Sequence, residues 1–242
     1  GKVSGKDFNG NEANPLDYAG YVGRGYTLAN AGTTVNIDGI RYVQKYDGAD
    51  KAGVYDVTDA EGNTLVFDAE GLSTIIKAGG KAKLANDITI TSKWDERYTG
   101  RSTEPVSIDG GGHTIKFACE INDGYNYHCA FRFQNSAVVK NLTIDMSEAT
   151  APGRWLRAIS ATGDLTIEKC KFIGNNNYSK ANAVVYGETN ISAQIDATTS
   201  ITGCEFVNWS RGISDNENAK EVKNVVVSKN TLTNAASYIS AY

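Results

Sequence analysis

The feature that most constrains this chain is a repeated pattern of apolar residues in its second half. In this pattern an aliphatic residue is followed, three and five positions later, by residues expected to point into the core, as in Val139, Leu142 and Ile144. The pattern begins four times, at Val139, Ile167, Ile201 and Val227. The intervals are 28, 34 and 26 residues, and a period in this range with variable insertions is typical of a solenoid. We therefore expect successive turns of one coil, each packed on its neighbours.

A second short strand is expected in every turn, after the loop that follows the first. These strands are predicted at residues 130–133, 157–160, 183–186, 211–214 and 237–240. Two of them belong to the related sequences WLRAIS (155–160) and WSRGIS (209–214), which start 54 residues apart. That interval spans two turns, so equivalent residues should lie roughly 10 Å apart along the coil axis, at about 4.8 Å for each strand interval.

A helix is predicted at the start of the coil, over residues 68–80. Asp68 is a suitable N-cap, Leu72 and Ile76 share one side, and the two glycines at 79–80 end the helix. A strand over 82–90 follows it directly. Because the first turn of a solenoid exposes its core and an unpaired strand edge, we expect this helix to cover that end.

The segments VSIDGGGHTIKF (106–117) and VVKNLTID (138–145) are typical of right-handed parallel β-helix proteins. Over residues 68–242 the chain resembles the pectin-lyase-like superfamily. The resemblance implies an all-β fold, a right-handed single-stranded parallel β-helix with an N-terminal capping helix. It does not specify the chemistry, because this superfamily includes lyases, hydrolases, adhesins and phage fibres.

Residues 1–67 fit the repeat poorly and are predicted to form a small β-rich N-terminal region. The segment 33–44 indicates a hairpin through Asp38-Gly39, and 53–68 indicates another through Glu61-Gly62. The alternative interpretation is that this region forms irregular coils of the same solenoid. The predicted organisation is therefore 1–67 followed by a β-helix over 68–242.

Composition excludes several classes of protein. A net charge of −4 argues against a nucleic-acid-binding protein, which would normally carry a basic stripe. No apolar run is long enough for a transmembrane segment, and no signal peptide is present. Because Gly1 indicates a processed or engineered start, we still expect a secreted or cell-surface protein, of bacterial origin.

The cysteines and histidines do not indicate a metal site. The four cysteines form no CxxC pair and the chain has only two histidines, so we expect no metal and no cofactor. Cys119 and Cys129 flank one loop, and they form either a disulfide or two buried thiols. Cys170 and Cys204 fall in one inward column with Asn230, where we expect packing and a side-chain ladder.

The insertions carry the candidate ligand-binding residues. Every long loop follows the same strand of its turn, so all should emerge along one edge. Aromatic rings can pack on sugar rings while arginines bind hydroxyls or carboxylates. The alternative is that these aromatics form small satellite cores, with cation–π contacts such as that of Arg157 with Trp155 sealing the coil. The predicted ligand-binding residues are Trp94, Arg97, Tyr98, Tyr125, Tyr127, His128, Arg154, Trp155, Arg157, Tyr178, Trp209 and Arg211.

No catalytic residue is predicted. A glycosidase needs two facing carboxyl groups, but the outward columns of the aligned strand stack no two acids, and Lys171 with Glu205 indicates a cross-strand ion pair. The motifs that the resemblance would supply for hydrolases, and the acidic cluster of calcium-dependent lyases, are missing. Whether the chain is an enzyme is left uncertain, with the balance towards no.

The sequence therefore predicts an extracellular or cell-surface β-helix protein that binds a polysaccharide or other glycan through loops on one edge. One alternative is a polysaccharide lyase or glycoside hydrolase. Another is a structural stalk or adhesin that binds protein, which would show a continuous apolar patch. The oligomeric state is left open.

Overall fold

The computed structural model describes residues 61–122, 128–153, 155–175, 177, 180–188, 193–215, 219–222, 224–235 and 237–240. It also gives the backbone of four short strands upstream, at 27–28, 34–37, 40–45 and 53–58. Within these residues, no helix is both long and apolar enough to cross a membrane. The description below concerns this part of the chain.

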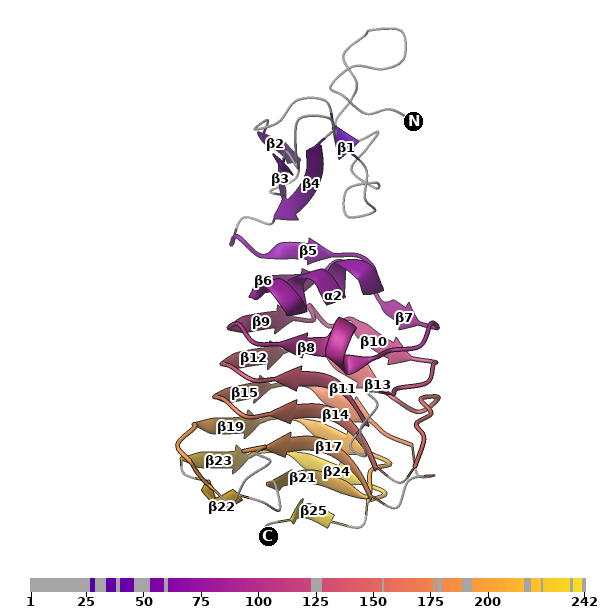
Figure 1. Cartoon of the computed structure of the whole chain (residues 1–242), viewed down its shortest axis with the longest axis vertical. Coiled ribbons are helices and arrows are strands. Elements are labelled where there is room, and N and C mark those ends of the chain that lie inside the picture. The colour runs from indigo at the N-terminus through magenta and orange to yellow at the C-terminus, as the bar shows by residue number, and fades with distance from the viewer. Residues whose placement is uncertain are drawn as a thin grey trace, which may run out of the picture.

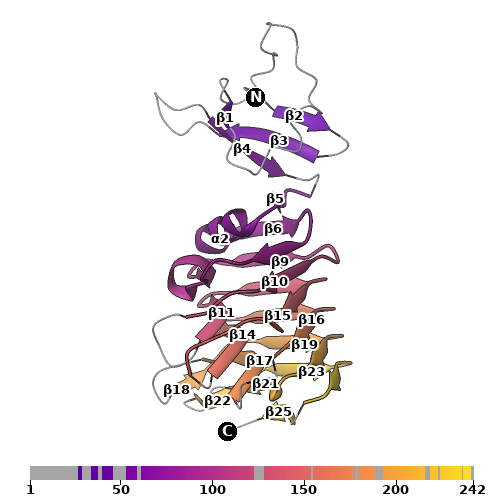
Figure 2. The ribbon, with the colours of Figure 1, turned by 90° about the vertical axis from the view of Figure 1, so that its right-hand side faces the viewer.

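Three parallel sheets form the sides of a stack of about five turns (Figures 1 and 2). The first sheet contains β6 (Gly80–Leu84), β9 (Val106–Asp109), β12 (Ala137–Lys140), β15 (Leu165–Glu168), β19 (Thr199–Thr202) and β23 (Val225–Ser228). The second contains β7 (Ile88–Ile90), β10 (Thr114–Phe117), β13 (Thr143–Asp145), β16 (Lys171–Ile173), β20 (Glu205–Val207) and β24 (Thr231–Thr233). The third contains β8 (Arg101–Ser102), β11 (His128–Phe133), β14 (Trp155–Ala161), β17 (Lys180–Tyr186), β21 (Arg211–Asp215) and β25 (Ser237–Ser240). The predicted parallel β-helix is confirmed.

The register of the first sheet confirms the repeat that the sequence indicated. Val139 pairs with Ile167, Ile167 with Ile201, and Ile201 with Val227, each in a parallel ladder. All but Val227, in the last turn, are fully buried. The variable interval between these residues is taken up by loops on the other sides of the coil, so insertions leave the register unchanged.

The core runs along the axis of the stack as rows of equivalent side chains. Phe172 lies directly over Phe206, with ring centroids 5.2 Å apart and nearly parallel planes. Near the other end, Phe117, Phe131 and Trp94 meet edge to face at 5.5–6.1 Å. Because each turn buries its apolar residues against the turns above and below, the stack gains hydrophobic stability turn by turn.

Helix α2 (Ala69–Ala78) lies across the N-terminal end of the stack, as predicted (Figure 2). The Asp68 carboxylate caps it by accepting a 2.8 Å hydrogen bond from the Gly71 amide. Leu72 and Ile76 are fully buried in the same core as the coil. The residue after the helix, Gly79, has a φ of 76°, and a Cβ there would lie 2.7 Å from that of Glu104, so glycine is required.

The upstream strands form the hairpins that the turn sequences indicated. β2 (Thr34–Ile37) pairs antiparallel with β3 (Ile40–Lys45), and β3 with β4 (Gly53–Thr58). β1 (Thr27–Leu28) is antiparallel to β4. β5 (Thr64–Val66) is antiparallel to β4 and parallel to β6, so it links these strands to the first sheet. The division of the chain at residue 67 stays a prediction.

Two further strands lie outside the coil. β18 (Ala193–Ile195) and β22 (Ala219–Val222) form a separate two-stranded parallel sheet. Each belongs to a segment that connects the third sheet of one turn to the first sheet of the next. Insertions on this side of successive turns therefore pair with each other, as parallel strands of the coil do. The expectation that every long loop follows the same strand was wrong, because these two insertions follow the third sheet.

The four cysteines are buried free thiols, which settles the alternative left open for Cys119 and Cys129. The predicted side-chain ladder at Asn230 is also present. Its Oδ1 accepts a 2.7 Å hydrogen bond from the Cys204 amide, and its Nδ2 donates a 2.9 Å bond to the Ile201 carbonyl. This side chain thus satisfies backbone groups of the preceding turn at a corner of the coil.

Candidate functional site

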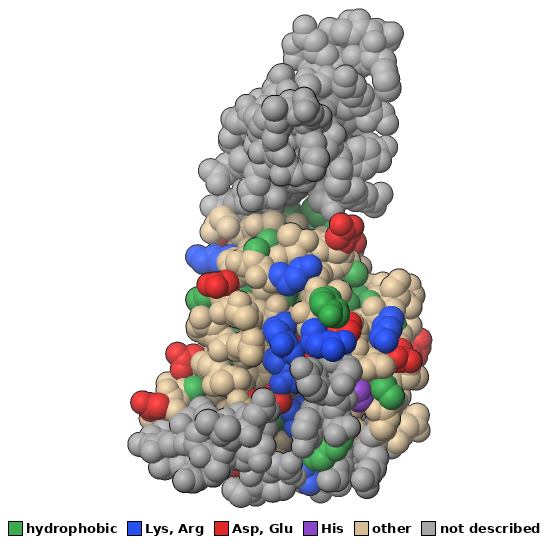
Figure 3. Space-filling model, viewed as in Figure 1, with side chains coloured by type: hydrophobic (Ala, Val, Ile, Leu, Met, Phe, Trp, Pro, Cys, Tyr) green, Lys and Arg blue, Asp and Glu red, His purple; other side chains and the backbone are tan. Residues whose placement is uncertain are grey.

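Four arginines lie on the outer side of the third sheet, and one of them, Arg157, is only 4% exposed. Arg101 on β8 pairs in register with Arg132 on β11. Arg157 on β14 and Arg211 on β21 occupy a neighbouring row, separated by Asn182 on β17. We call Arg101, Arg132, Arg157 and Arg211 the arginine ladder. In Figure 3 a run of blue side chains crosses this face over β8, β11 and β14.

The strand pattern explains why these arginines point outwards. Arg132 lies between Phe131 and Phe133, whose rings are in the core. Arg157 likewise lies between the core residues Leu156 and Ala158. Since successive side chains of a strand alternate between its two faces, Arg132 is placed on the outside. Strict alternation does not hold at Arg157, because Ala158 and Ile159 are both core residues, and its outward position follows from its contact with Glu188.

Two carboxylates bind three of the arginines into one network. Glu96 Oε1 lies 2.6 Å from Arg101 Nε and 3.0 Å from Arg132 Nε. Glu188 Oε1 lies 2.6 Å from Arg132 Nη1 and 3.0 Å from Arg157 Nη1. Positive and negative groups thus alternate along the sheet, and the Glu96 hydrogen bond raises the pKa of Arg101 above its ordinary value.

The site also contains buried hydrogen-bond acceptors that the described residues leave unsatisfied. Glu188 Oε2 and Asn182 Oδ1 are buried, and neither has a hydrogen-bond partner in this part of the chain. Buried polar atoms are nearly always paired, so an unsatisfied one needs an explanation. These acceptors lie beside the ladder, because Glu188 binds Arg157 and Asn182 is the neighbour of Arg157 in the sheet.

A π-helical turn, η1 (Glu96–Gly100), supplies one carboxylate and displays one aromatic ring. Glu96 points inwards and is 0% exposed, whereas Tyr98 is 66% exposed. Gly100 packs so tightly on β11 that an added Cβ would lie 2.0 Å from the Ala130 carbonyl oxygen. Single π-turns are rare and are frequent at functional sites. This turn places a buried acid and an exposed ring side by side.

Arg97 and Asp95 hold the outer side of this turn. The Arg97 guanidinium forms two hydrogen bonds with the Asp95 carboxylate, at 3.0 and 2.7 Å. It also lies 5.3 Å from the centroid of the Tyr98 ring, in a cation–π contact. The hydrogen bond with Arg97 holds the pKa of Asp95 below its ordinary value.

Trp155 opens β14 and is partly exposed, and the Arg157 guanidinium lies 5.8 Å from its ring centroid. The predicted cation–π pair is therefore present. His128 opens β11 and is nearly buried, with Nε2 2.5 Å from the Pro152 carbonyl oxygen. Trp155 and His128 thus lie at the N-terminal ends of two neighbouring strands of the third sheet.

Two of the predicted ligand-binding residues are core residues instead. Trp94 is 2% exposed and donates a 2.7 Å hydrogen bond to the Ala130 carbonyl. Trp209 is 0% exposed and packs on Gly174, where an added Cβ would lie 2.5 Å from its ring. Stacking on a sugar requires an exposed ring face, and neither tryptophan offers one. Both tryptophans belong to the main core of the coil and not to a separate satellite core, so Trp155 and Trp209 are not equivalent.

The other predicted residues divide into two groups. Arg97, Tyr98, His128, Trp155, Arg157 and Arg211 lie on the third sheet or in the turn before it. Tyr125, Tyr127, Arg154 and Tyr178 lie outside the described residues. The sequence prediction did not include Arg101, Arg132 or Glu188. A signal for Arg132 was available in the HCAFRF sequence of β11, where this charged residue lies between two phenylalanines of the core.

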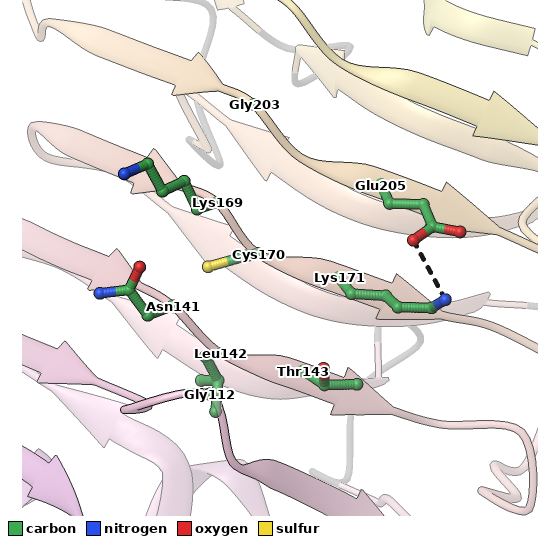
Figure 4. A pocket seen from close by; sticks show the side chains of 9 residues that line it. All are labelled: Gly112, Asn141, Leu142, Thr143, Lys169, Cys170, Lys171, Gly203 and Glu205. Atoms are coloured by element: carbon green, nitrogen blue, oxygen red, sulfur yellow. Dashed lines mark ion pairs between the residues drawn. The ribbon is translucent and has the colours of Figure 1, made fainter.

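Two cavities lie elsewhere on the described surface. The corner cavity, of about 340 Å³, lies between the first and second sheets (Figure 4). In it Lys171 Nζ lies 3.0 Å from Glu205 Oε2, which confirms the predicted ion pair. It is lined by Gly112, Asn141, Leu142, Thr143, Lys169, Cys170, Lys171, Gly203 and Glu205. A second cavity, of about 370 Å³, includes Asn135, Asp164 and Asp196. Among the described residues, no three His, Cys, Asp or Glu side chains are grouped to hold a metal ion.

Comparison of the chain with protein-family models, with curated proteins and with solved structures gave no match. The proposed function therefore rests on the contacts, burial and charges of the described residues.

Proposed function

We propose that the protein binds an acidic glycan on the outer face of the third sheet, along the arginine ladder. The observation that carries this proposal is the grouping of four arginines on one face, three of which bind the carboxylates of Glu96 and Glu188. Arg211 extends the same face by two further strands. A ligand that carries carboxylate groups suits a face on which arginine side chains gather.

The residue types suit such a ligand. Arginine presents a rigid fork of donors that matches a carboxylate in a bidentate geometry. Trp155 and Tyr98 offer ring faces on which the apolar face of a sugar can pack. Tyr98 precedes β8 and Trp155 opens β14, two strand intervals or about 10 Å further along the stack, so both rings could contact one extended polymer.

The unsatisfied acceptors give further support. Sugar hydroxyls are hydrogen-bond donors, and Glu188 Oε2 and Asn182 Oδ1 need donors. As a consequence of this ligand class, we also propose that the protein acts outside the cell, either secreted or on the cell surface.

The first experiment is a calorimetric titration with acidic polysaccharides (polygalacturonate, alginate and hyaluronate) and with neutral dextran. We expect an acidic polymer to bind, dextran not to bind, and added salt to weaken the binding. Arg101→Ala and Trp155→Ala should each weaken it at least tenfold. The matched control, Lys116→Ala, removes a positive charge from the second sheet and should leave binding unchanged. Absence of binding to every acidic polymer, or an equal loss in the control, contradicts the proposal.

The same mixtures test the enzyme alternative, and the described surface bears on the stalk alternative. New reducing ends would indicate a hydrolase and unsaturated ends a lyase, and either result would replace simple binding as the function. For a protein-binding stalk we expected a continuous apolar patch. Among the described residues the exposed large hydrophobic side chains are Tyr98, in the turn η1, and Val226, on β23 of the first sheet. That observation favours glycan over protein as the ligand of this part of the chain.

A further inference from the structure

Two thiols lie on successive turns at the corner between the first and second sheets. Cys170 and Cys204 directly precede β16 and β20, and the next residues, Lys171 and Glu205, pair in register. Both thiols are buried in the core. The other two cysteines have no such neighbour, because Cys129 pairs in register with Arg157 and the Cys119 carbonyl accepts from the Thr150 amide.

The strand spacing places the two cysteines within reach of a disulfide. The Glu205 amide donates a 2.9 Å hydrogen bond to the Cys170 carbonyl, so the parallel ladder continues through this position. Neighbouring strands lie about 4.8 Å apart, and disulfides join residues whose Cα atoms lie about 4.4–6.8 Å apart. The backbone therefore already has the required spacing.

Only the side chains need to turn. At present Cys170 Sγ donates to the Glu168 carbonyl at 3.3 Å, and Cys204 Sγ donates to the Thr202 carbonyl at 3.4 Å. A thiol is a weak donor, so giving up these bonds costs little. The corner cavity provides a route for a reagent, because Cys170 forms part of its lining (Figure 4). Cys119 and Cys129 line neither of the two cavities described above.

We propose that Cys170 and Cys204 are a redox modification site that a small disulfide oxidant, of the oxidised-glutathione class, converts to a disulfide joining two successive turns. The Cys170 thiolate attacks one sulfur of the oxidant, the S–S bond of the oxidant breaks, and one thiol leaves with a proton. Cys204 then attacks the mixed disulfide at Cys170 and releases the second thiol. Two cysteines are oxidised and the oxidant is reduced to two thiols. The proposal is independent of the glycan function.

The reaction should be slow in the folded protein. The interaction with Cys204, together with burial, raises the pKa of Cys170, so little thiolate is present at neutral pH. We expect oxidation on the order of hours, the range of uncatalysed disulfide exchange. Exposed thiols of a small peptide in the same solution should react faster.

The test is mass-spectrometric mapping of the full chain. The reduced protein is incubated with oxidised glutathione under native conditions, and the remaining thiols are alkylated after unfolding. We expect one crosslinked peptide pair, carrying residues 170 and 204, with Cys119 and Cys129 both alkylated. The oxidised chain should also unfold at a temperature several degrees higher, about what a crosslink closing a loop of this size provides, and reduction should reverse that shift.

Cysteine variants test which residues the crosslink requires. The double variant Cys119→Ser/Cys129→Ser should still form the crosslink, and Cys170→Ser should not. If Cys170→Ser does not fold, the mapping of the unmodified chain decides the question. The proposal is overturned if residues 170 and 204 stay fully alkylatable after prolonged oxidation. It is also overturned by a mixture of disulfide pairs, or by glutathione retained at Cys170 without the second step.

Discussion

Among single residues, Glu96 has the largest influence on the candidate site. Its side chain is fully buried, and its carboxylate binds both Arg101 and Arg132. Removing one member of a buried ionic network leaves its partners buried without a counter-charge, which costs far more than losing an exposed pair. Glu96 therefore links the stability of the coil to the order of the arginine ladder.

We predict that Glu96→Gln lowers the free energy of unfolding by about 3 kcal/mol, because Arg101 and Arg132 both lose a fully buried carboxylate partner. Urea denaturation measures this change. The control is Glu205→Gln, which removes one member of the half-exposed Lys171 pair and should cost less than about 1 kcal/mol. Equal effects of the two substitutions would mean that the buried network contributes no more than a surface pair.

A second residue-scale prediction concerns pH and Asp95. Arg97 holds the pKa of the folded Asp95 below its ordinary value of 3.8. A carboxylate with a lowered folded pKa stabilises the protein above its unfolded pKa, and loses that contribution as the pH falls through the folded pKa. Asp95→Asn should thus destabilise the protein at pH 6, and this destabilisation should diminish as the pH falls through the folded pKa of Asp95. Unfolding curves at several pH values measure this pH-dependent stabilisation. Arg97→Ala should remove the same stabilisation, because it removes the partner of Asp95.

At the scale of structural elements, the corner before the second sheet repeats one hydrogen-bonding role with different residues. Asn230 Nδ2 donates to the Ile201 carbonyl of the preceding turn. Cys204 Sγ lies 3.8 Å from the Ile167 carbonyl, and Cys170 Sγ lies 3.5 Å from the Val139 carbonyl. Each of these carbonyls belongs to the equivalent residue of its turn. The thiols thus take the place of an asparagine carboxamide.

We predict that Cys204→Asn is tolerated to within about 1 kcal/mol of the unmodified chain, because the carboxamide can donate to Ile167 as Asn230 donates to Ile201. Cys204→Asp has nearly the same shape but no amide donor, and it would bury a charge. It should lower the free energy of unfolding by about 3 kcal/mol or more. Thermal and urea unfolding compare the two variants. Similar stabilities would show that this position tolerates any small polar side chain.

At the scale of the whole molecule, the sequence predicted the stack well because the fold depends on local periodicity. Val139, Ile167 and Ile201 show the interval directly, and the first-sheet register follows from it. Helix α2 was predictable for the same reason, since its cap and its apolar side are within one short segment. Insertions between turns did not disturb the prediction, because each turn packs only on its neighbours.

The candidate site was only partly predictable, because it depends on contacts between turns. Trp209 turns inwards because Gly174, more than thirty residues earlier, leaves space for its ring. No pattern near residue 209 indicates this. Glu188 likewise binds Arg132 and Arg157 of earlier turns, and its partners cannot be read from spacing alone. Sequence reasoning thus identified the edge of the sheet but not the charge network on it.

Hydrogen–deuterium exchange with and without a bound acidic polysaccharide is the most direct test of the account, because it locates the ligand on the intact chain. We predict slower exchange over Arg101–Ser102, His128–Phe133 and Trp155–Ala161, the strands β8, β11 and β14 that carry the first three residues of the arginine ladder. The strands of the second sheet should exchange at unchanged rates. Protection confined to the second sheet, or none at a polymer concentration that saturates binding, would contradict the account.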